Sequence, residues 1–238
     1  HGAGSSCGKN LSKETFSTLG TQKKTNYALR ENMSKQEFIS ELLDGMPTPP
    51  RYFKENAMMN KQGYNSFDDV IRQGVRALDI NEFKNFLLNP DIILLDVRHQ
   101  KDFIKKHIPN SIFIGLNGNF APWVGSIIGN TNKKIVLITP KGKENEAVTR
   151  LSRVGFDNCL GYLKGGVEKW EKDGNSVSYL ESIKSKNFID ILKLNKINIL
   201  DVRKESEFSS KHIEGATNIP LRLLSGRFQE VKVDENLY

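Results

Sequence analysis

The feature that most constrains the fold of this chain is a long internal repeat. The segment LLDVRHQKDFIKKHIPNSIFIGL, residues 94–116, returns without gaps as ILDVRKESEFSSKHIEGATNIPL, residues 199–221. The spacing that pairs Asp96 with Asp201 also pairs His107 with His212. Solenoid repeats have periods of about 20–50 residues, and this period is much longer. The chain therefore contains two copies of one domain-sized unit.

Each copy predicts the same local structure. An apolar run ending in Asp-Val-Arg predicts a buried strand, and a short amphipathic helix and a second strand follow it. The first copy is flanked by further segments with helix or strand patterns. They are residues 80–88 (helix), 134–138 (strand), 143–155 (helix), 158–163 (strand) and 166–174 (helix). Strands that alternate with helices at this spacing predict an α/β fold, a parallel sheet flanked by helices, present twice.

The chain divides into three parts on this basis. The first unit is expected over residues 73–178, and the second copy over 179–238 is cut off before its equivalent of the strand at 134–138, with Leu237 and Tyr238 as that strand's entry. Residues 1–68 belong to neither copy. There the Ser34-x-x-Glu37 pattern predicts a helix start, and MPTPPRYF, residues 46–53, predicts an extended segment that ends helical structure. Residues 1–68 thus read as the end of an upstream domain, so the chain is expected to be a fragment.

Composition excludes several classes of protein. Neither a membrane-spanning apolar run nor a signal peptide is present. Two distant cysteines, Cys7 and Cys159, cannot form a disulfide framework and suit a reducing compartment, so the cytoplasm is expected. The formal charge of +7 comes from lysines scattered among acidic residues. A nucleic-acid partner is therefore not expected, although the charge favours small anionic substrates.

The repeated polar residues suit structural roles. Arg98 and Asp102 are four residues apart, like Arg203 and Glu207 in the second copy, which predicts an ion pair where the strand turns into the helix. His107 and its counterpart are expected to bond a backbone carbonyl or a carboxylate. These residues therefore indicate the fold more than the function.

The segment IVLITPKGKENEA, residues 135–147, has the pattern of an active-site loop between a strand and a helix. Together with Asp-Val-Arg, the HI and IP pairs, and the LKGG and Trp that follow, it resembles the rhodanese family of sulfurtransferases. In that family a cysteine in a C-x-x-G loop carries persulfide sulfur, and here Thr139 stands at the cysteine's position and Gly142 at the glycine's. A threonine hydroxyl has no sulfur to transfer. The first unit is thus expected to lack catalysis, and Cys159, in the next strand, is expected to be buried rather than a substitute.

The amino-terminal part shows a second resemblance. HGAGSSCGKNLS (1–12), STLGTQKKTNYAL (17–29) and MPTPPRYFKENAMMNKQG (46–63) are similar to the closing segments of metallo-β-lactamase-fold persulfide dioxygenases, relatives of the glyoxalase II hydrolases. NFAPWVGSIIG (119–129) fits the subgroup of these enzymes that continues into rhodanese units.

This second resemblance implies candidate site residues. His1 would be a metal ligand, although most ligands of the non-haem iron would come from upstream, so no cofactor is expected on this chain alone. Cys7 would lie beside the metal, and Lys23, Lys24 and Asn26 would receive substrate carboxylates. A turn around Cys7 and a solvated helix face with the two lysines and the asparagine are the structural alternatives.

Two functions follow from these resemblances. In the first, the chain is part of a persulfide dioxygenase and sulfurtransferase of sulfide and persulfide detoxification. Its partner would be a small thiol persulfide or thiosulfate, and a homo-oligomer is a candidate assembly. The intact protein would be the enzyme, and this fragment would be inactive. In the second, tandem rhodanese folds form a non-catalytic docking module.

Overall fold

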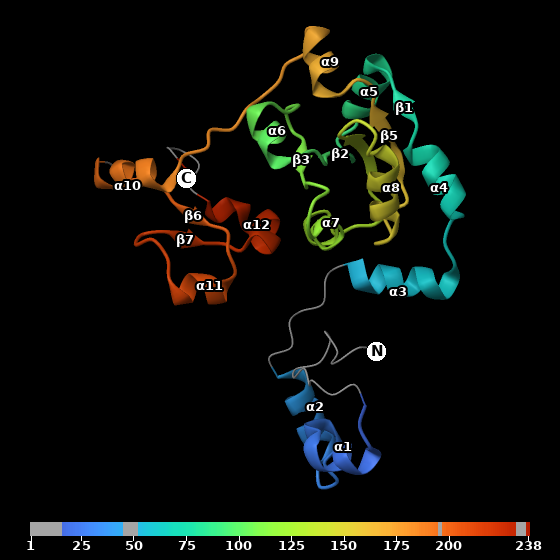
Figure 1. Ribbon diagram of the computed structural model, residues 1–238, viewed down its shortest axis with the longest axis vertical. Coiled ribbons are helices and arrows are strands. Elements are labelled where there is room, and N and C mark those ends of the chain that lie inside the picture. The colour runs from blue at the N-terminus through green and yellow to red at the C-terminus, as the bar shows by residue number, and fades with distance from the viewer. Residues whose placement is uncertain (1–15, 45–51, 195–196, 232–236) are drawn as a thin grey trace. The chain divides into compact units, whose positions relative to one another are not determined.

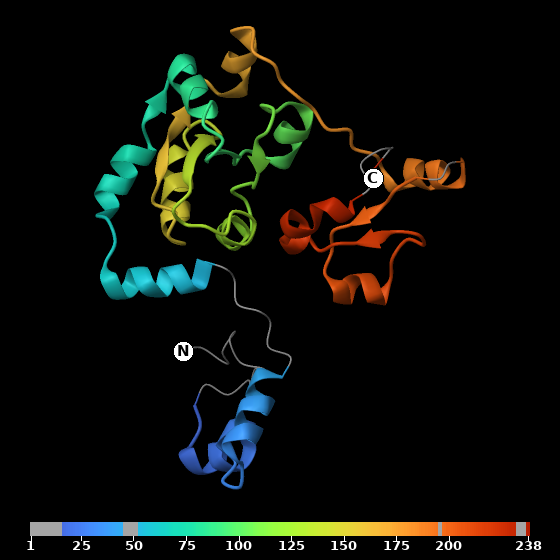
Figure 2. The same ribbon diagram turned by 180° about the vertical axis from the view of Figure 1, so that it is seen from behind.

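The computed structural model describes residues 16–44, 52–194, 197–231 and 237–238 (Figures 1 and 2). Two compact units make up the chain, His1–Pro49 and Pro50–Tyr238. Among the described helices, none is long and apolar enough to cross a membrane.

The first compact unit contains short helices: α1 (Leu19–Thr25), the 3₁₀ helix η1 (Tyr27–Leu29) and α2 (Lys35–Leu43). The predicted capping box at α2 is confirmed. The Glu37 backbone N–H donates to Ser34 Oγ at 3.2 Å, and the Ser34 N–H donates to Glu37 Oε2 at 2.8 Å. Each residue thereby satisfies a donor that the helix itself leaves free.

The second compact unit begins with α3 (Tyr52–Gln62) and continues into the first copy of the repeat. The elements of this copy are α4 (Phe67–Gly74), β1 (Ala77–Leu78), α5 (Ile80–Leu87), β2 (Ile92–Asp96), α6 (Gln100–Lys105), β3 (Ile112–Phe113), α7 (Phe120–Ile127), β4 (Lys134–Ile138), α8 (Glu144–Ser152), β5 (Cys159–Leu163) and α9 (Gly166–Lys172).

The five strands form one parallel sheet in the order β1-β5-β4-β2-β3, which confirms the predicted fold class. Apolar residues of β4 alternate between the two faces of this sheet. Ile135 and Leu137 pack beneath α4, α7 and α8, whereas Val136 and Ile138 pack against α5 and α9. Figure 1 shows α8 and α5 flanking the central strands. The core thus fills both faces of the sheet, as parallel sheets require.

Helix α3 differs from the expectation for this segment. Tyr52 and Phe53, which the proline-rich pattern predicts to be extended, lie in its first turn. Tyr52 is buried in the core of the first copy, and Glu55 Oε2 accepts hydrogen bonds from Thr131 N (3.1 Å) and Thr131 Oγ1 (2.9 Å). Because these contacts reach residues far along the chain, the compact unit starts earlier than the boundary expected from the repeat.

The second copy repeats the first part of this framework. Its elements are α10 (Ser185–Leu194), β6 (Leu200–Asp201), α11 (Glu205–Ser210), β7 (Thr217–Asn218), α12 (Leu221–Arg227) and the 3₁₀ helix η2 (Phe228–Glu230).

Strands β6 and β7 pair in parallel, as β2 and β3 do. On the other edge of β6, Leu237 forms a parallel bridge with Asn198, where the first copy places β4 against β2. The Leu200 N–H donates to the Tyr238 carbonyl at 2.8 Å, and the Tyr238 N–H donates to the Asn198 carbonyl at 2.9 Å. Leu237 and Tyr238 thus lie where the sequence places the entry to the next strand, and the contact is a single bridge.

Candidate functional site

The site begins where β4 ends. Thr139 follows Ile138 directly and is buried. The Lys143 N–H donates to the Pro140 carbonyl at 3.0 Å, which closes a tight turn, and Gly142 takes the left-handed conformation with φ of 79°. Helix α8 then starts at Glu144. The strand, loop and helix predicted around Thr139 are therefore all present.

An acidic side chain accepts a hydrogen bond from a backbone N–H of this loop. The Gly142 N–H donates to Glu144 Oε1 at 3.1 Å. The Lys143 ammonium is bonded to Glu146 Oε2 at 2.9 Å, and this hydrogen bond lowers the pKa of Glu146. The first turn of α8 thus carries two carboxylates, which suit the positive end of the helix dipole.

Neither Thr139 nor Cys159, which pairs with Ile135 near the other end of β4, supplies a reactive thiolate. Cys159 in β5 is fully buried, its Sγ faces the Gly74 carbonyl at 3.7 Å, and burial raises the pKa of its thiol to about 12. A thiol with such a pKa stays protonated near neutral pH and is a poor nucleophile. The predicted buried role of Cys159 is confirmed.

The predicted ion pair between Arg98 and Asp102 is wrong. Arg98 instead bonds Asp96, with its Nε 3.0 Å and its Nη2 2.7 Å from Oδ2, and Nη2 also donates to the Lys106 carbonyl at 2.7 Å. Arg98 lies between the end of β2 and the first turn of α6. Side chains two residues apart on extended backbone point to the same side, so Arg98 reaches Asp96. The pair therefore ties the strand end to the end of α6.

The second copy repeats this arrangement, so the expected pair of Arg203 with Glu207 is also wrong. Arg203 Nε lies 3.0 Å from Asp201 Oδ2, and its Nη2 donates to the Lys211 carbonyl at 2.9 Å. Hydrogen bonding from Arg203 lowers the pKa of Asp201. The pair is therefore part of the repeated framework.

The two histidines have the carbonyl partners predicted for them. His107 Nδ1 lies 2.9 Å from the Phe103 carbonyl, and His212 Nδ1 lies 2.8 Å from the Phe208 carbonyl. Each ring also stacks on the phenylalanine that provides the carbonyl. Both histidines therefore hold the chain just after a short helix.

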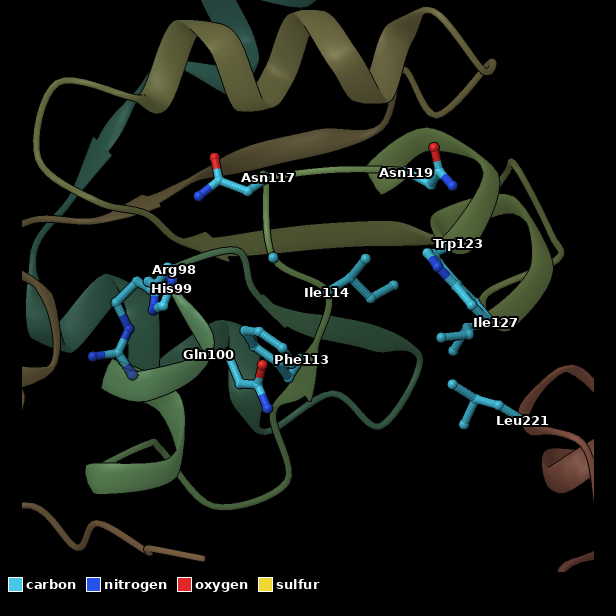
Figure 3. A pocket seen from close by; sticks show the side chains of 11 residues that line it. Arg98, His99, Gln100, Phe113, Ile114, Asn117, Asn119, Trp123, Ile127 and Leu221 are labelled. Atoms are coloured by element: carbon cyan, nitrogen blue, oxygen red, sulfur yellow. The ribbon is translucent and has the colours of Figure 1, made fainter. Parts of the chain in front are cut away.

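A pocket of about 350 Å³ opens beside the ends of β2 and β3 (Figure 3). Arg98 and His99 lie on one side of it, and Trp123 and Ile127 of α7 lie on the other (Figure 3). Its remaining lining residues are Gln100, Phe113, Ile114, Gly115, Asn117, Asn119 and Leu221. In the sequence, the nearest signal for this pocket is the NFAPWVGSIIG segment, in which an exposed tryptophan stands on a mostly apolar helix.

Sequence reasoning missed a tether behind the pocket. Arg150 of α8 donates to the carbonyl oxygens of Leu116 and Gly118, and its guanidinium carbon lies 5.3 Å from the Phe120 ring centre. This arginine holds the segment between β3 and α7 onto the helix that follows the Thr139 loop. No sequence pattern links residues so far apart.

Three of the candidate residues at the amino-terminal end lie in or beside α1. Lys23 pairs with Glu31 at 3.0 Å, and Lys24 is exposed. The Asn26 side chain donates to Gln22 Oε1 at 3.1 Å and accepts from the Ala28 N–H at 3.0 Å, so it joins α1 to η1.

His1 and Cys7 lie outside the described residues. Within the part of the chain that the structure describes, no group of three or more His, Cys, Asp or Glu side chains could hold a metal ion. The described residues therefore do not fit the iron that the sequence resemblance implies.

Comparisons with solved structures give neighbours with TM-scores below 0.5. A metallo-beta-lactamase from Staphylococcus aureus is 31% identical, covers 68% of this chain and has a TM-score of 0.48. The chain spans only 42% of that protein's length. The Alr3790 protein from Anabaena sp. is 18% identical, with 49% of this chain and 88% of that one covered and a TM-score of 0.39.

A thiosulfate sulfurtransferase from Pseudomonas aeruginosa is 14% identical, with 77% of this chain and 39% of that one covered and a TM-score of 0.37. No curated protein matches the chain.

The sequence model of the Rhodanese-like domain family matches residues 79–173 and 185–237, more than half of the chain. These ranges coincide with the two copies of the strand and helix framework described above. At the level of this family, the chemistry that the match supports is sulfur transfer. The chain belongs to the Rhodanese-like domain family.

Proposed function

We propose that this chain is part of a persulfide dioxygenase and sulfurtransferase of sulfide and persulfide detoxification. Two rhodanese-like copies support the sulfurtransferase part. The dioxygenase part rests on the order of the sequence segments before the repeat. The whole protein would oxidise a low-molecular-weight persulfide to sulfite with molecular oxygen, and a rhodanese cysteine would move sulfane sulfur.

In this proposal the first rhodanese unit is a non-catalytic spacer. The observation that carries this role is Thr139 at the end of β4, where the family's loop is otherwise complete. The Arg98–Asp96 pair, the left-handed Gly142 and helix α8 are all in place. The fold has therefore kept the scaffold of the loop without the sulfur that the chemistry needs.

The iron would bind and activate oxygen and persulfide sulfur when present, on ligands mainly from outside this chain. His1 remains a candidate ligand. The described residues do not provide its ligands.

Lys23, Lys24, Asn26 and Cys7 remain candidates for contact with a small thiol persulfide or thiosulfate. The lysines provide positive charge for substrate carboxylates. We expect the protein to work in the cytoplasm, and a homo-oligomer is the candidate assembly to test for.

Assays of thiosulfate:cyanide sulfur transfer test the spacer role directly. The unmodified 238-residue chain should form no thiocyanate above the buffer rate. Thiocyanate formed at an enzymatic rate would sink this role. For the natural protein that contains the chain, oxygen uptake with glutathione persulfide should be accompanied by sulfite release, and its absence would overturn the dioxygenase proposal.

A second candidate function is a docking module. The pocket beside α7 favours it, because Trp123 is 41% exposed and lines the pocket beside Ile127 (Figure 3). Exposed aromatic side chains are common at binding surfaces. Both functions predict no sulfur transfer by this chain. A docking module would also show no oxygen uptake in the natural protein, so the oxygen-uptake assay separates the two functions.

A further inference from the structure

We infer that Glu144 is a built-in anion that closes the Thr139 loop, so that two residues and not one exclude anionic sulfur species from the first unit. This inference rests on the proposed spacer role and names Glu144 as a residue that keeps anionic sulfur species out of the loop. In the loop after β4, the Gly142 N–H donates to Glu144 Oε1 at 3.1 Å. One backbone donor of the loop is thus already bonded to a carboxylate of the chain itself.

The charges around the loop act in the same direction. A thiolate, a persulfide or a sulfonate is stabilised by backbone N–H groups and a helix N-terminus. Here Glu144 and Glu146 already occupy the first turn of the nine-residue helix α8. Lys143, which directly precedes α8, is bonded to Glu146 at 2.9 Å. An anion in this loop would meet two carboxylates and an engaged lysine.

The backbone itself remains suited to the family's chemistry. Gly142 keeps its left-handed φ of 79°, and open space surrounds the position where a Cβ would lie. The turn hydrogen bond from Lys143 to Pro140 is also present. Because the loop has not collapsed, its closure depends on a side chain and can be reversed by substitution.

The test compares Thr139→Cys with Thr139→Cys/Glu144→Ala in the full chain. The pH dependence of alkylation by iodoacetamide, followed by mass spectrometry of the peptide around position 139, gives the pKa of the new thiol. Glu144→Ala should lower this pKa by at least about one unit, which makes alkylation about tenfold faster at a pH well below it. Glu144→Gln removes the charge but keeps an acceptor, and should give an intermediate rate.

Thr139→Cys/Glu146→Ala is the matched control. It removes the same charge from the same helical turn, but Glu146 contacts Lys143 and not Gly142. Its alkylation rate should rise by much less than that of the Glu144 variant, because Glu146 does not accept from the loop N–H. If the Glu144 and Glu146 variants react equally fast, the specific role of Glu144 is overturned. The urea unfolding midpoint is measured for each variant. Equal midpoints ensure that the alkylation rates are compared between folded proteins.

Sulfur transfer from thiosulfate gives a second readout. The new thiolate attacks the outer sulfur, the sulfur–sulfur bond of thiosulfate breaks, and sulfite leaves with the bonding electron pair. The peptide around position 139 then carries one extra sulfur atom. This product should accumulate in Thr139→Cys/Glu144→Ala and much more slowly in Thr139→Cys. Equal accumulation in both would overturn the inference, whereas transfer by the unmodified chain would instead overturn the spacer role.

Discussion

At the scale of single residues, the repeat places one ion pair in two different environments. In the first copy, the side chain of Asp96 is fully buried and that of Arg98 is 9% exposed. In the second copy, the side chains of Asp201 and Arg203 are 11% and 46% exposed. Water can replace Arg203 at the second pair but has little access to the first. The same sequence motif therefore contributes differently to stability in the two copies.

Arg98→Ala should be strongly destabilising because it leaves the buried Asp96 carboxylate without its partner. Removing one member of a buried pair costs about 3–5 kcal/mol. Arg203→Ala, the matched change in the second copy, should cost only about 0–1 kcal/mol, as at exposed pairs. Urea unfolding followed by tryptophan fluorescence measures the loss of stability in Arg98→Ala. Hydrogen exchange of β6 measures the loss in Arg203→Ala. Equal losses of stability would mean that burial does not decide the contribution of the pair.

Cys159 should resist alkylation in the folded chain. With a pKa of about 12, only about 1 in 10,000 of its thiols is ionised at pH 8. Iodoacetamide at pH 8 should therefore modify Cys159 only after unfolding in urea, as mass spectrometry of its peptide would report. Rapid modification of the native chain would contradict the burial described for β5.

The same raised pKa predicts how stability changes in alkaline solution. The folded state holds the Cys159 proton more tightly than the unfolded state, whose thiol has an ordinary pKa near 9.0. Between these two values the folded state binds more protons, so stability falls as the pH rises. Cys159→Ala should show a weaker decline in urea midpoint over this range than the unmodified chain. Parallel declines would assign the alkaline loss to other groups.

At the scale of elements, the strands and helices of the repeat could be predicted because their apolar residues follow the period of each element. The pairing of Arg98 could not be predicted, because charged side chains four residues apart pair within a helix and Arg98 precedes α6.

Helix α3 was missed for a different reason. Prolines stand before it, and the partners of Tyr52 and Glu55 are more than 70 positions further along the chain. The acidic closure of the Thr139 loop also depends on local geometry that the sequence pattern does not specify.

Helix α3 is held by a close contact between an aromatic ring and a glycine. A Cβ added to Gly125 would lie 2.0 Å from Cδ1 of Tyr52, far inside contact distance. Gly125→Ala should therefore displace α3 and destabilise the unit by about 1–3 kcal/mol, the usual cost of overpacking. In a Tyr52→Ala background the ring is gone, so Gly125→Ala should add little. A double-mutant cycle in urea measures this coupling, and additive losses would show that the two residues do not share the contact.

At the scale of the whole molecule, the two copies differ in how well their strands are covered. Three of the five β2 residues are buried, whereas both residues of β6 are only partly buried. Amide hydrogens of β6 should therefore exchange with deuterium faster than those of β2, because sparse burial favours local opening. Mass spectrometry of peptides from both strands provides the measurement. Equal protection would indicate that the copies unfold as one cooperative unit.

The chain on its own should purify without a stoichiometric metal. The described residues offer no group of three or more ligands, and His1 alone cannot hold iron. Elemental analysis after dialysis against a chelator should find well under one iron or zinc per chain. About one tightly held metal ion per chain would reveal a complete site and contradict this expectation.

Helix α3 also determines where a gene encoding the first unit can be shortened. A version that starts at residue 68 would lose Tyr52, leaving a hollow beside Gly125, and would lose Glu55, leaving the buried Thr131 N–H without its acceptor. A buried donor left in this way costs about 1–3 kcal/mol. A version that starts at Pro50 would keep both contacts. The part of the chain that can be expressed in folded form therefore begins before the repeat itself begins.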